Sequence, residues 1–76
     1  MMRRLTLVHL LKHPEKRHRF KKVRIWSGEH LAWWGPDSRG YTCDIRDAGI
    51  YTMDEAWATS SHCCKKKKII YYEVKL

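Results

Sequence analysis

Residues 52–74 read TMDEAWATSSHCCKKKKIIYYEV, a helix signal followed by a strand signal. Thr52 and Glu55 form a capping box: the Thr52 hydroxyl accepts from the backbone N–H three residues on, and the Glu55 carboxylate accepts from the backbone N–H of Thr52. A helix is therefore predicted over residues 53–61. The residues expected to face inward are Met53, Ala56 and Trp57.

Residues 69–74 give the strongest strand signal in the chain, because they are β-branched and aromatic with few breakers. A strand places alternate side chains on opposite faces. One face is expected to carry Ile69, Tyr71 and Glu73, and the other Ile70, Tyr72 and Val74.

Three shorter strands are predicted before the helix. Residues 20–26 alternate between apolar and polar side chains, which indicates a half-buried strand. One side of it carries Val23 and Ile25, and the other carries Lys22, Arg24 and Trp26. Two more strands are expected at residues 31–34 and 41–43, on either side of the turn-forming run GPDSRG.

The order of these signals, β-β-β-α-β, predicts an α+β fold with a small antiparallel sheet of three to four strands and one helix packed on a face. We expect a basic N-terminal extension at residues 1–19, helical or mobile, and a single small domain at residues 20–76. In the extension, an amphipathic helix would carry Leu7, Leu10 and Leu11 on one face.

Length and composition exclude several classes of protein. The chain has 76 residues, which is enough for one domain and too few for a Rossmann fold, a barrel enzyme or a two-domain cleft. No run approaches the roughly 18 apolar residues of a membrane span, so no membrane partner is expected. Cys43, Asp44 and His62 form a conceivable catalytic set, but nothing in their spacing brings a base to the thiol, and no enzyme activity is expected.

The net charge of +8 is unevenly distributed. Residues 1–24 hold nine Lys or Arg and one acid, residues 25–64 hold two basic residues and six acids, and residues 65–76 hold five Lys and one acid. Basic ends that meet in space would form one positive patch that attracts polyanions. The alternative is a solvated lysine loop and a mobile basic tail.

Basic side chains beside exposed aromatics are typical of surfaces that bind nucleic acid or protein. Trp26 lies on the charged side of its strand and is expected to be the exposed aromatic, whereas Trp57 and one of Trp33 or Trp34 are expected in the core. The candidate partner- or nucleic-acid-binding residues are Lys21, Lys22, Arg24, Trp26, Arg39, Lys65, Lys66, Lys67 and Lys68.

The chain has three cysteines, and an odd number is a poor basis for a disulfide framework, so a reducing compartment is expected. Zinc sites are usually built from paired ligands spaced as C-x2-4-C or H-x3-5-H. None of the candidate ligands has a partner among the others at that spacing, and we expect no metal and no other cofactor. Those candidates are His30, Cys43, His62, Cys63 and Cys64.

Short motifs follow one another between residues 30 and 56: WWGP at 33–36, GYT at 40–42, DI at 44–45, AGIYT at 48–52 and EA at 55–56. This pattern resembles one found in small uncharacterised phage and prophage accessory proteins. The resemblance implies a phage-type binding protein in the cytoplasm of a bacterial host. Such a protein would bind and sterically inhibit a host protein or ribonucleoprotein complex, for example a defence complex such as a CRISPR effector.

Three functions are therefore considered, in order. The first is the inhibitor of a host protein or ribonucleoprotein. The second is a direct RNA- or DNA-binding protein that uses its basic ends and exposed aromatics. The third is a small metal-binding protein. A homodimer is compatible with any of them, because a symmetric partner would supplement such a small core.

Overall fold

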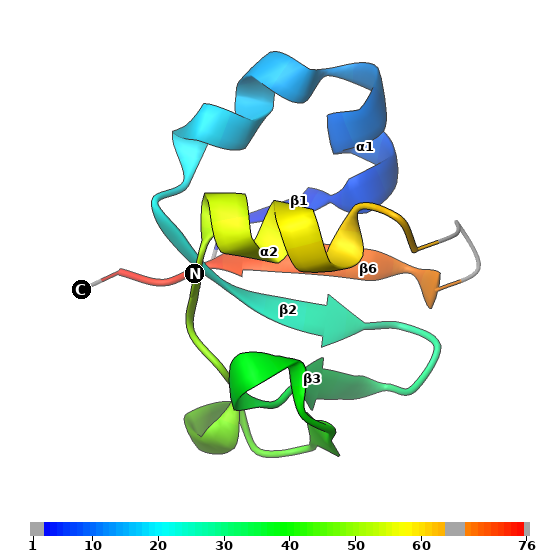
Figure 1. Ribbon diagram of the computed structural model, residues 1–76, viewed down its shortest axis with the longest axis vertical. Coiled ribbons are helices and arrows are strands. Elements are labelled where there is room, and N and C mark those ends of the chain that lie inside the picture. The colour runs from blue at the N-terminus through cyan, green and yellow to red at the C-terminus, as the bar shows by residue number, and fades with distance from the viewer. Residues whose placement is uncertain (1–2, 64–66, 76) are drawn as a thin grey trace.

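The elements of the chain follow the predicted order, with additions at the N-terminus and before the long helix (Figure 1). The structure is a computed structural model that describes residues 3–63 and 67–75. Its elements, with η for 3₁₀ helices, are β1 (Arg4–Thr6), α1 (Leu7–Lys12), η1 (Pro14–Arg19), β2 (Lys22–Ser27), β3 (Ala32–Trp34), η2 (Pro36–Ser38), β4 (Tyr41–Thr42), η3 (Ile45–Asp47), β5 (Tyr51–Thr52), α2 (Met53–Ser60) and β6 (Ile69–Glu73).

Six strands form one antiparallel sheet in the order β1-β6-β2-β3-β4, with β5 paired to the start of β2. The α+β class and the helix packed on the sheet are confirmed. The sheet is larger than the three to four strands predicted. The additional strands, β1 and β5, have three and two residues, which is too short to show an alternating pattern.

The N-terminal segment contributes to both the sheet and the core. Residues 4–6 pair with β6, and α1 follows directly, with Thr6 Oγ1 accepting from the backbone N–H of His9. Leu7 and Leu10 are buried, whereas Leu11, expected on the same face, is 49% exposed. Successive residues lie about 100° apart on a helix, and this short helix buries only the stripe that contains Leu7 and Leu10.

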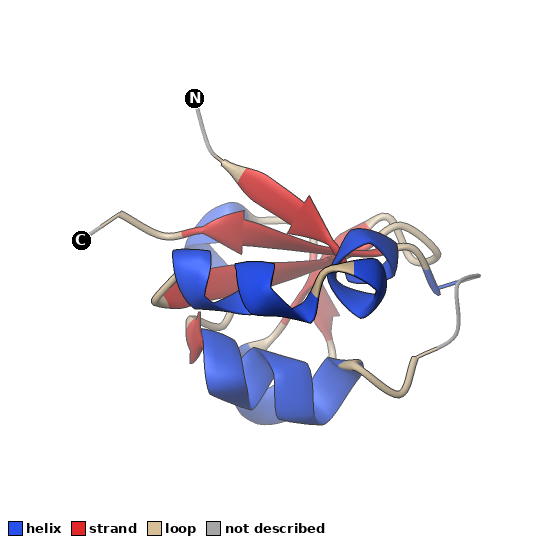
Figure 2. Cartoon of the chain, turned by 90° about the horizontal axis from the view of Figure 1, so that it is seen from above, coloured by secondary structure: helices blue, strands red, loops and turns tan. Residues whose placement is uncertain are grey.

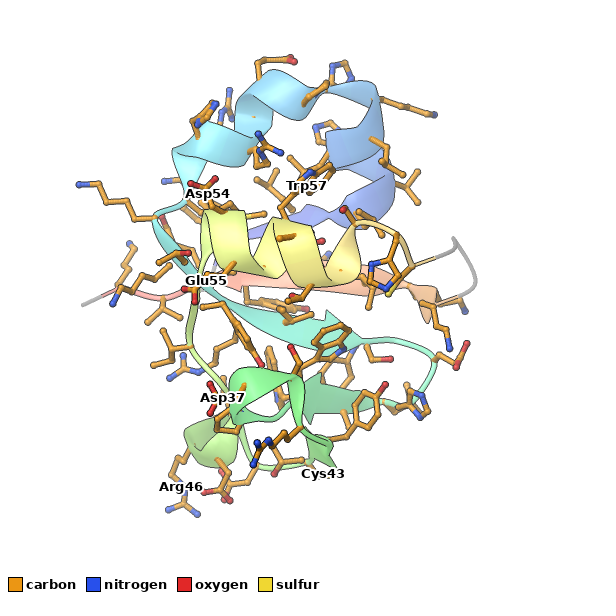
Figure 3. The ribbon with its side chains drawn as sticks, in the orientation of Figure 1. Asp37, Cys43, Arg46, Asp54, Glu55 and Trp57 are labelled. Carbon is orange, nitrogen blue, oxygen red and sulfur yellow. The ribbon has the colours of Figure 1, made fainter. Side chains whose placement is uncertain are left out.

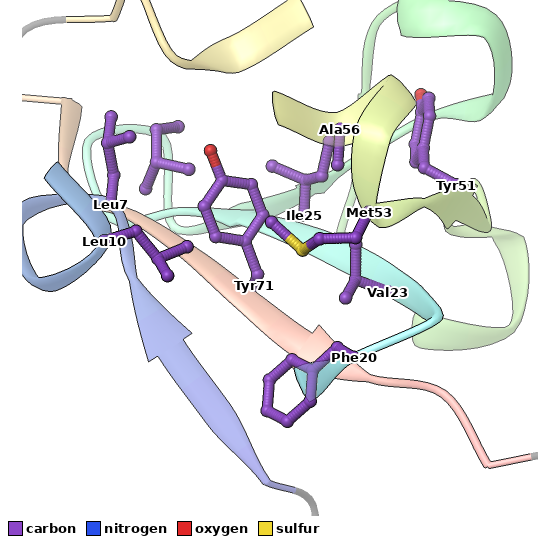
Figure 4. Close-up of a cluster of buried hydrophobic side chains, with 10 residues drawn as sticks. Leu7, Leu10, Phe20, Val23, Ile25, Tyr51, Met53, Ala56 and Tyr71 are labelled. Carbon is purple, nitrogen blue, oxygen red and sulfur yellow. The ribbon is translucent and has the colours of Figure 1, made fainter. Parts of the chain in front are cut away.

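The core lies between the sheet and α2 (Figure 4). Val23 and Ile25 of β2 and Tyr71 of β6 are fully buried, as the alternation of both strands predicts. Met53 and Ala56 of α2 are buried in the same cluster and cover these three side chains on the helix side. This one sheet face and one helix stripe supply most of the apolar burial that stabilises so small a domain.

The predicted capping box is present at the start of α2. Thr52 Oγ1 accepts from the backbone N–H of Glu55 at 3.1 Å, and Glu55 Oε1 accepts from the backbone N–H of Thr52 at 3.0 Å. The helix ends at Ser60, one residue earlier than predicted. Trp57, expected inside, is half-buried and packs against the edge of the core.

A buried hydroxyl pair joins α2 to β6. The Ser60 hydroxyl donates to the carbonyl of Ala56, so the Tyr71 hydroxyl, 2.5 Å from Ser60 Oγ, is the donor in the second bond. Burial raises the pKa of Tyr71 to about 12. The ring thus remains neutral at physiological pH and spans the middle of the core.

Candidate functional site

The face of the sheet that points away from α2 carries a separate set of side chains. In β2 and β6, residues that point toward α2 are mostly buried, and those that point away are half-buried or exposed. Figure 2 shows the sheet edge-on, with α2 packed along one side of the strands. We call the other side the open face. Its residues are Arg4, Thr6, Lys22, Arg24, Trp26, Trp33, Thr42, Ile70 and Tyr72.

Strand register aligns these side chains in rows across the sheet. Tyr72 of β6 is paired with Arg4 of β1 on one side and with Arg24 of β2 on the other. Directly paired residues in antiparallel strands lie on the same face, with Cβ atoms about 4.5–5.5 Å apart. The neighbouring row runs Thr6, Ile70, Trp26, Trp33 and Thr42.

Trp33 is the centre of an aromatic cluster on the open face. Its ring lies 5.1 Å from that of Trp26 and 5.2 Å from that of Tyr72, and both contacts are edge-to-face. Such pairs contribute about 0.5–1.5 kcal/mol each beyond their area. Trp33 is only 9% exposed, while Trp26 and Tyr72 are half-buried. The cluster is therefore ordered and leaves parts of two rings accessible.

The open face is basic. Arg4, Lys22 and Arg24 lie on it, and none of its nine residues is acidic. The Nε atom of Arg24 is buried and has no hydrogen-bond partner in the described part of the chain. A guanidinium beside aromatic rings is suited to an anionic group such as phosphate, to which it can donate two parallel hydrogen bonds.

Several acidic side chains elsewhere are held in local interactions. Asp44 accepts from Arg46 at 2.8 Å, and this pairing lowers the pKa of the Asp44 carboxyl. Glu29 pairs with Lys67 at 3.0 Å in the turn after β2. The pKa of Glu55 is lowered because its carboxylate accepts from the backbone of the capping box. None of these three carboxylates belongs to the open face, although Glu55 interacts electrostatically with Lys22.

The structure brings three of the predicted site residues together. Lys22, Arg24 and Trp26 share the open face, as the alternation of residues 20–26 predicts. Trp26 is half-buried against Trp33, so the prediction that it is the exposed aromatic is wrong. The aromatic exposed beyond half is Tyr41, which stacks on His30 at a ring distance of 4.2 Å.

The remaining predicted residues lie elsewhere. Lys21 lies just before β2 and lines a cavity with Thr52 and Met53 at the start of α2. Arg39 is exposed after η2. Beside the turn that follows β2, Lys67 is half-buried and Lys68 is exposed with a φ of 50°. Lys65 and Lys66 lie outside the described residues.

The open face also contains a cation and two aromatic residues that were not predicted as site residues: Arg4, Trp33 and Tyr72. The alternation of residues 69–74 does place Tyr72 on one face with Ile70. The sequence does not say which face the helix covers, and that choice decides whether Tyr72 or Tyr71 is accessible. One of Trp33 and Trp34 was expected to be buried, and Trp33 is. It is buried among the residues of the open face, however, and not beneath α2. Trp34 packs against the core instead.

A concavity of about 450 Å³ lies on the α2 side of the molecule. Asp37 and Glu55 are at its rim (Figure 3), and the backbone of Asp37 and Ser38 is left-handed, with φ of 56° and 59°. The Tyr51 hydroxyl holds this turn by accepting from the Ser38 N–H and donating to the Gly35 carbonyl. The lining is Pro36, Asp37, Ser38, Ile50, Tyr51, Glu55, Ala58 and Thr59.

The metal-ligand candidates are scattered where they are described. Within residues 3–63 and 67–75, no three His, Cys, Asp or Glu side chains are placed to share a metal ion. Cys43 is exposed and Cys63 is half-buried at the edge of the core; Cys64 lies outside the described residues. His9 and His13, four residues apart, have their rings 4.8 Å apart, with the Lys16 ammonium 3.2 Å from His9 Nε2.

The described residues include no helix with the length and apolar character to cross a membrane. No family model matches the chain, and neither a curated protein nor a solved structure is similar to it. The arrangement of its side chains therefore carries the functional inference. Its most distinctive feature is the open face, which combines clustered aromatic rings with cations and contains no acid.

Proposed function

We propose that the open face binds single-stranded nucleic acid. The observation that carries the proposal is the pair of adjacent rows in which Arg4 and Arg24 flank Tyr72, beside Trp26 and Trp33. Unpaired bases stack on aromatic rings, and each stacked base contributes about 1–3 kcal/mol as measured by alanine substitution. The flanking guanidinium and ammonium groups are placed to neutralise the phosphates of the same strand.

The geometry favours an unpaired strand over a duplex. The accessible rings belong to Trp26 and Tyr72, which lie on the adjacent strands β2 and β6 of the sheet. A duplex keeps its bases stacked inside and offers rings on a flat surface nothing to stack on. A single strand can turn its bases toward the sheet while its phosphates reach the arginines.

The composition also favours nucleic acid over a protein partner. Trp, Tyr and Arg are common at protein–protein hot spots, but charged residues are depleted at the centre of such interfaces. Here three cations lie beside the aromatic cluster, and the Arg24 Nε is buried without a partner in the described residues. The inhibition of a host protein or ribonucleoprotein stays a prediction, and a ribonucleoprotein target would itself supply RNA.

The test is a binding titration with fluorescently labelled oligo-U and oligo-dT, followed by polarisation at several salt concentrations. Replacing Trp26 by alanine is expected to weaken binding by about 5- to 150-fold, the equivalent of about 1–3 kcal/mol. The logarithm of the association constant should also fall linearly with the logarithm of the salt concentration. A duplex of the same sequence is expected to bind more weakly.

Tyr41→Ala is the matched control, because it removes an exposed aromatic ring that faces away from the open face. Its affinity should equal that of the unmodified protein. Equal losses in the two variants, or no binding of either oligonucleotide at low salt, would contradict the proposal. A protein partner captured from bacterial lysate in nuclease-treated samples, and lost with Trp26→Ala, would instead support the inhibitor hypothesis.

A further inference from the structure

We propose that a cationic cavity between η1 and the start of α2 binds a phosphate group of the strand that lies on the open face. This inference rests on the proposed function and extends it around the end of β2. The cavity has a volume of about 250 Å³. Its lining residues are Arg17, His18, Phe20, Lys21, Thr52, Met53 and Asp54.

Arg17 is held in place without having its donors used. Its guanidinium lies 5.2 Å from the centre of the Trp57 ring, and Figure 3 shows Trp57 projecting from α2 toward η1. The Nε atom of Arg17 is buried and has no hydrogen-bond partner in the described residues. An oriented guanidinium loses little freedom on binding a phosphate and can donate two parallel hydrogen bonds to it.

Two further sources of positive potential face the same cavity. Lys21 is exposed, and its backbone carbonyl accepts from the Met53 N–H, which fixes this lysine beside the first turn of α2. The eight-residue helix α2 points its N-terminus at the cavity, and the positive end of a helix dipole favours anions. The acid in the lining is Asp54, whose carboxylate opposes an anion there.

The cavity and the open face are joined through β2. Lys22, the first residue of β2, is on the open face, and the preceding residue, Lys21, lines the cavity. From Arg24 to Lys21 the backbone covers about 10 Å at the rise of an extended strand. A single strand of nucleic acid bound at Tyr72 could continue past Arg24 and Lys22 to the start of β2. There it would reach Lys21 and Arg17.

Lys21→Gln tests this path, with Lys12→Gln as the matched control. Both replace an exposed lysine by a neutral side chain of similar length, and Lys12 ends α1, outside the cavity lining. In the oligo-U titration, Lys21→Gln is expected to weaken binding about fivefold and to reduce the slope of log K against log salt by about 0.7, the value for one phosphate on a single strand. Lys12→Gln should change the slope by much less.

Asp54→Asn provides a change of opposite sign. Removing the carboxylate from the cavity should strengthen oligonucleotide binding, because the carboxylate repels a bound phosphate. Inorganic phosphate and pyrophosphate test the cavity independently of the open face. They should shift the backbone NMR signals of residues 52–54 both in the unmodified protein and in Trp26→Ala. Oligonucleotides with and without a terminal phosphate then show whether the bound group is a chain end or an internal diester.

The results separate this inference from the function on which it rests. If Trp26→Ala loses oligonucleotide binding but Lys21→Gln and Lys12→Gln behave alike, the open face binds nucleic acid and the cavity proposal is wrong. If phosphate shifts residues 52–54 but no oligonucleotide binds, the cavity is an anion site and the proposed function is wrong. Absence of both effects overturns both proposals.

Discussion

The two faces of the sheet are made by alternate residues of the same strands, yet they are built from different chemistry. Toward α2, Val23 and Ile25 of β2 meet Tyr71 of β6 in a sealed core. On the other side, the intervening Arg24 pairs with Tyr72 on a surface that contains cations and partly accessible rings. Residues that stabilise the fold and residues proposed to bind nucleic acid are thus adjacent in one strand, and substitutions of neighbouring residues should separate the two effects in experiment.

The largest expected effect contrasts Ile25→Ala with Arg24→Gln. Ile25 is completely buried, and truncation of a buried isoleucine to alanine typically lowers the free energy of unfolding by about 2–5 kcal/mol. Arg24→Gln should leave the free energy of unfolding within about 1 kcal/mol, because no group in residues 3–63 and 67–75 is hydrogen-bonded to the Arg24 Nε. Urea denaturation measures both values.

The order of the same two variants should be reversed when oligonucleotide affinity is measured. Arg24→Gln is expected to lose about tenfold or more in affinity for oligo-U, the loss of a charge-assisted contact. Ile25→Ala should retain its affinity at a temperature where it is folded. If Arg24→Gln unfolds the protein and Ile25→Ala does not, the assignment of the two faces is reversed.

A smaller effect concerns the two adjacent tyrosines of β6 and their pH dependence. The pKa of Tyr71 is raised to about 12 by burial, compared with about 10 in an unfolded chain. Because the folded state resists ionisation of Tyr71, the contribution of this residue to the free energy of unfolding is complete below pH 10. It is lost as the pH rises toward 12. Tyr71→Phe should therefore show a flatter decline in unfolding free energy than the unmodified protein between these pH values.

Tyr72→Phe is the control for that measurement, since it removes a hydroxyl from the adjacent residue of the same strand, on the open face. At neutral pH, Tyr71→Phe is expected to cost about 1 kcal/mol, because it removes the hydrogen bond to the Ser60 hydroxyl. Urea denaturation at a series of pH values checks both points. An identical alkaline decline in the two variants would show that the Tyr71 hydroxyl is not the group responsible.

The smallest expected effect is at the far end of β2. Lys67 pairs with Glu29 at 3.0 Å on the surface, and exposed ion pairs of this kind contribute about 0–1 kcal/mol. Lys67→Gln should change both the free energy of unfolding and oligonucleotide affinity only slightly. A loss of affinity equal to that of Arg24→Gln would extend the binding surface along the whole length of β2 and revive the prediction that the lysine run binds the partner.

Local signals predicted much of this fold. The capping box at Thr52 and the alternation in residues 20–26 and 69–74 depend on residues close in sequence, and the structure has them nearly as predicted. β1 and β5 could not be predicted, because strands of three and two residues exist only through their partners β6 and β2. The additional strands therefore come from long-range pairing and not from local preference.

The candidate site was partly predictable for the same reason. Lys22, Arg24 and Trp26 share a face by strand periodicity alone, so any strand at residues 20–26 would align them. Arg4 and Tyr72 join them only through the register of β1, β6 and β2. The lysines at 67 and 68 are near Gly28 and Glu29, at the opposite end of β2 from Lys22, because β6 runs antiparallel to β2. Net charge alone could not show this separation.

The position of β6 between β1 and β2 has a consequence for how the protein is made. The strand is synthesised after the other ten described elements, yet it joins β1 to the rest of the sheet. Until it emerges, β1 has no neighbour, and Val23 and Ile25 lack Tyr71 beside them. Contacts between residues so distant in sequence form late. Chains that lack residues 69–73 should therefore be cleaved by protease along most of their length.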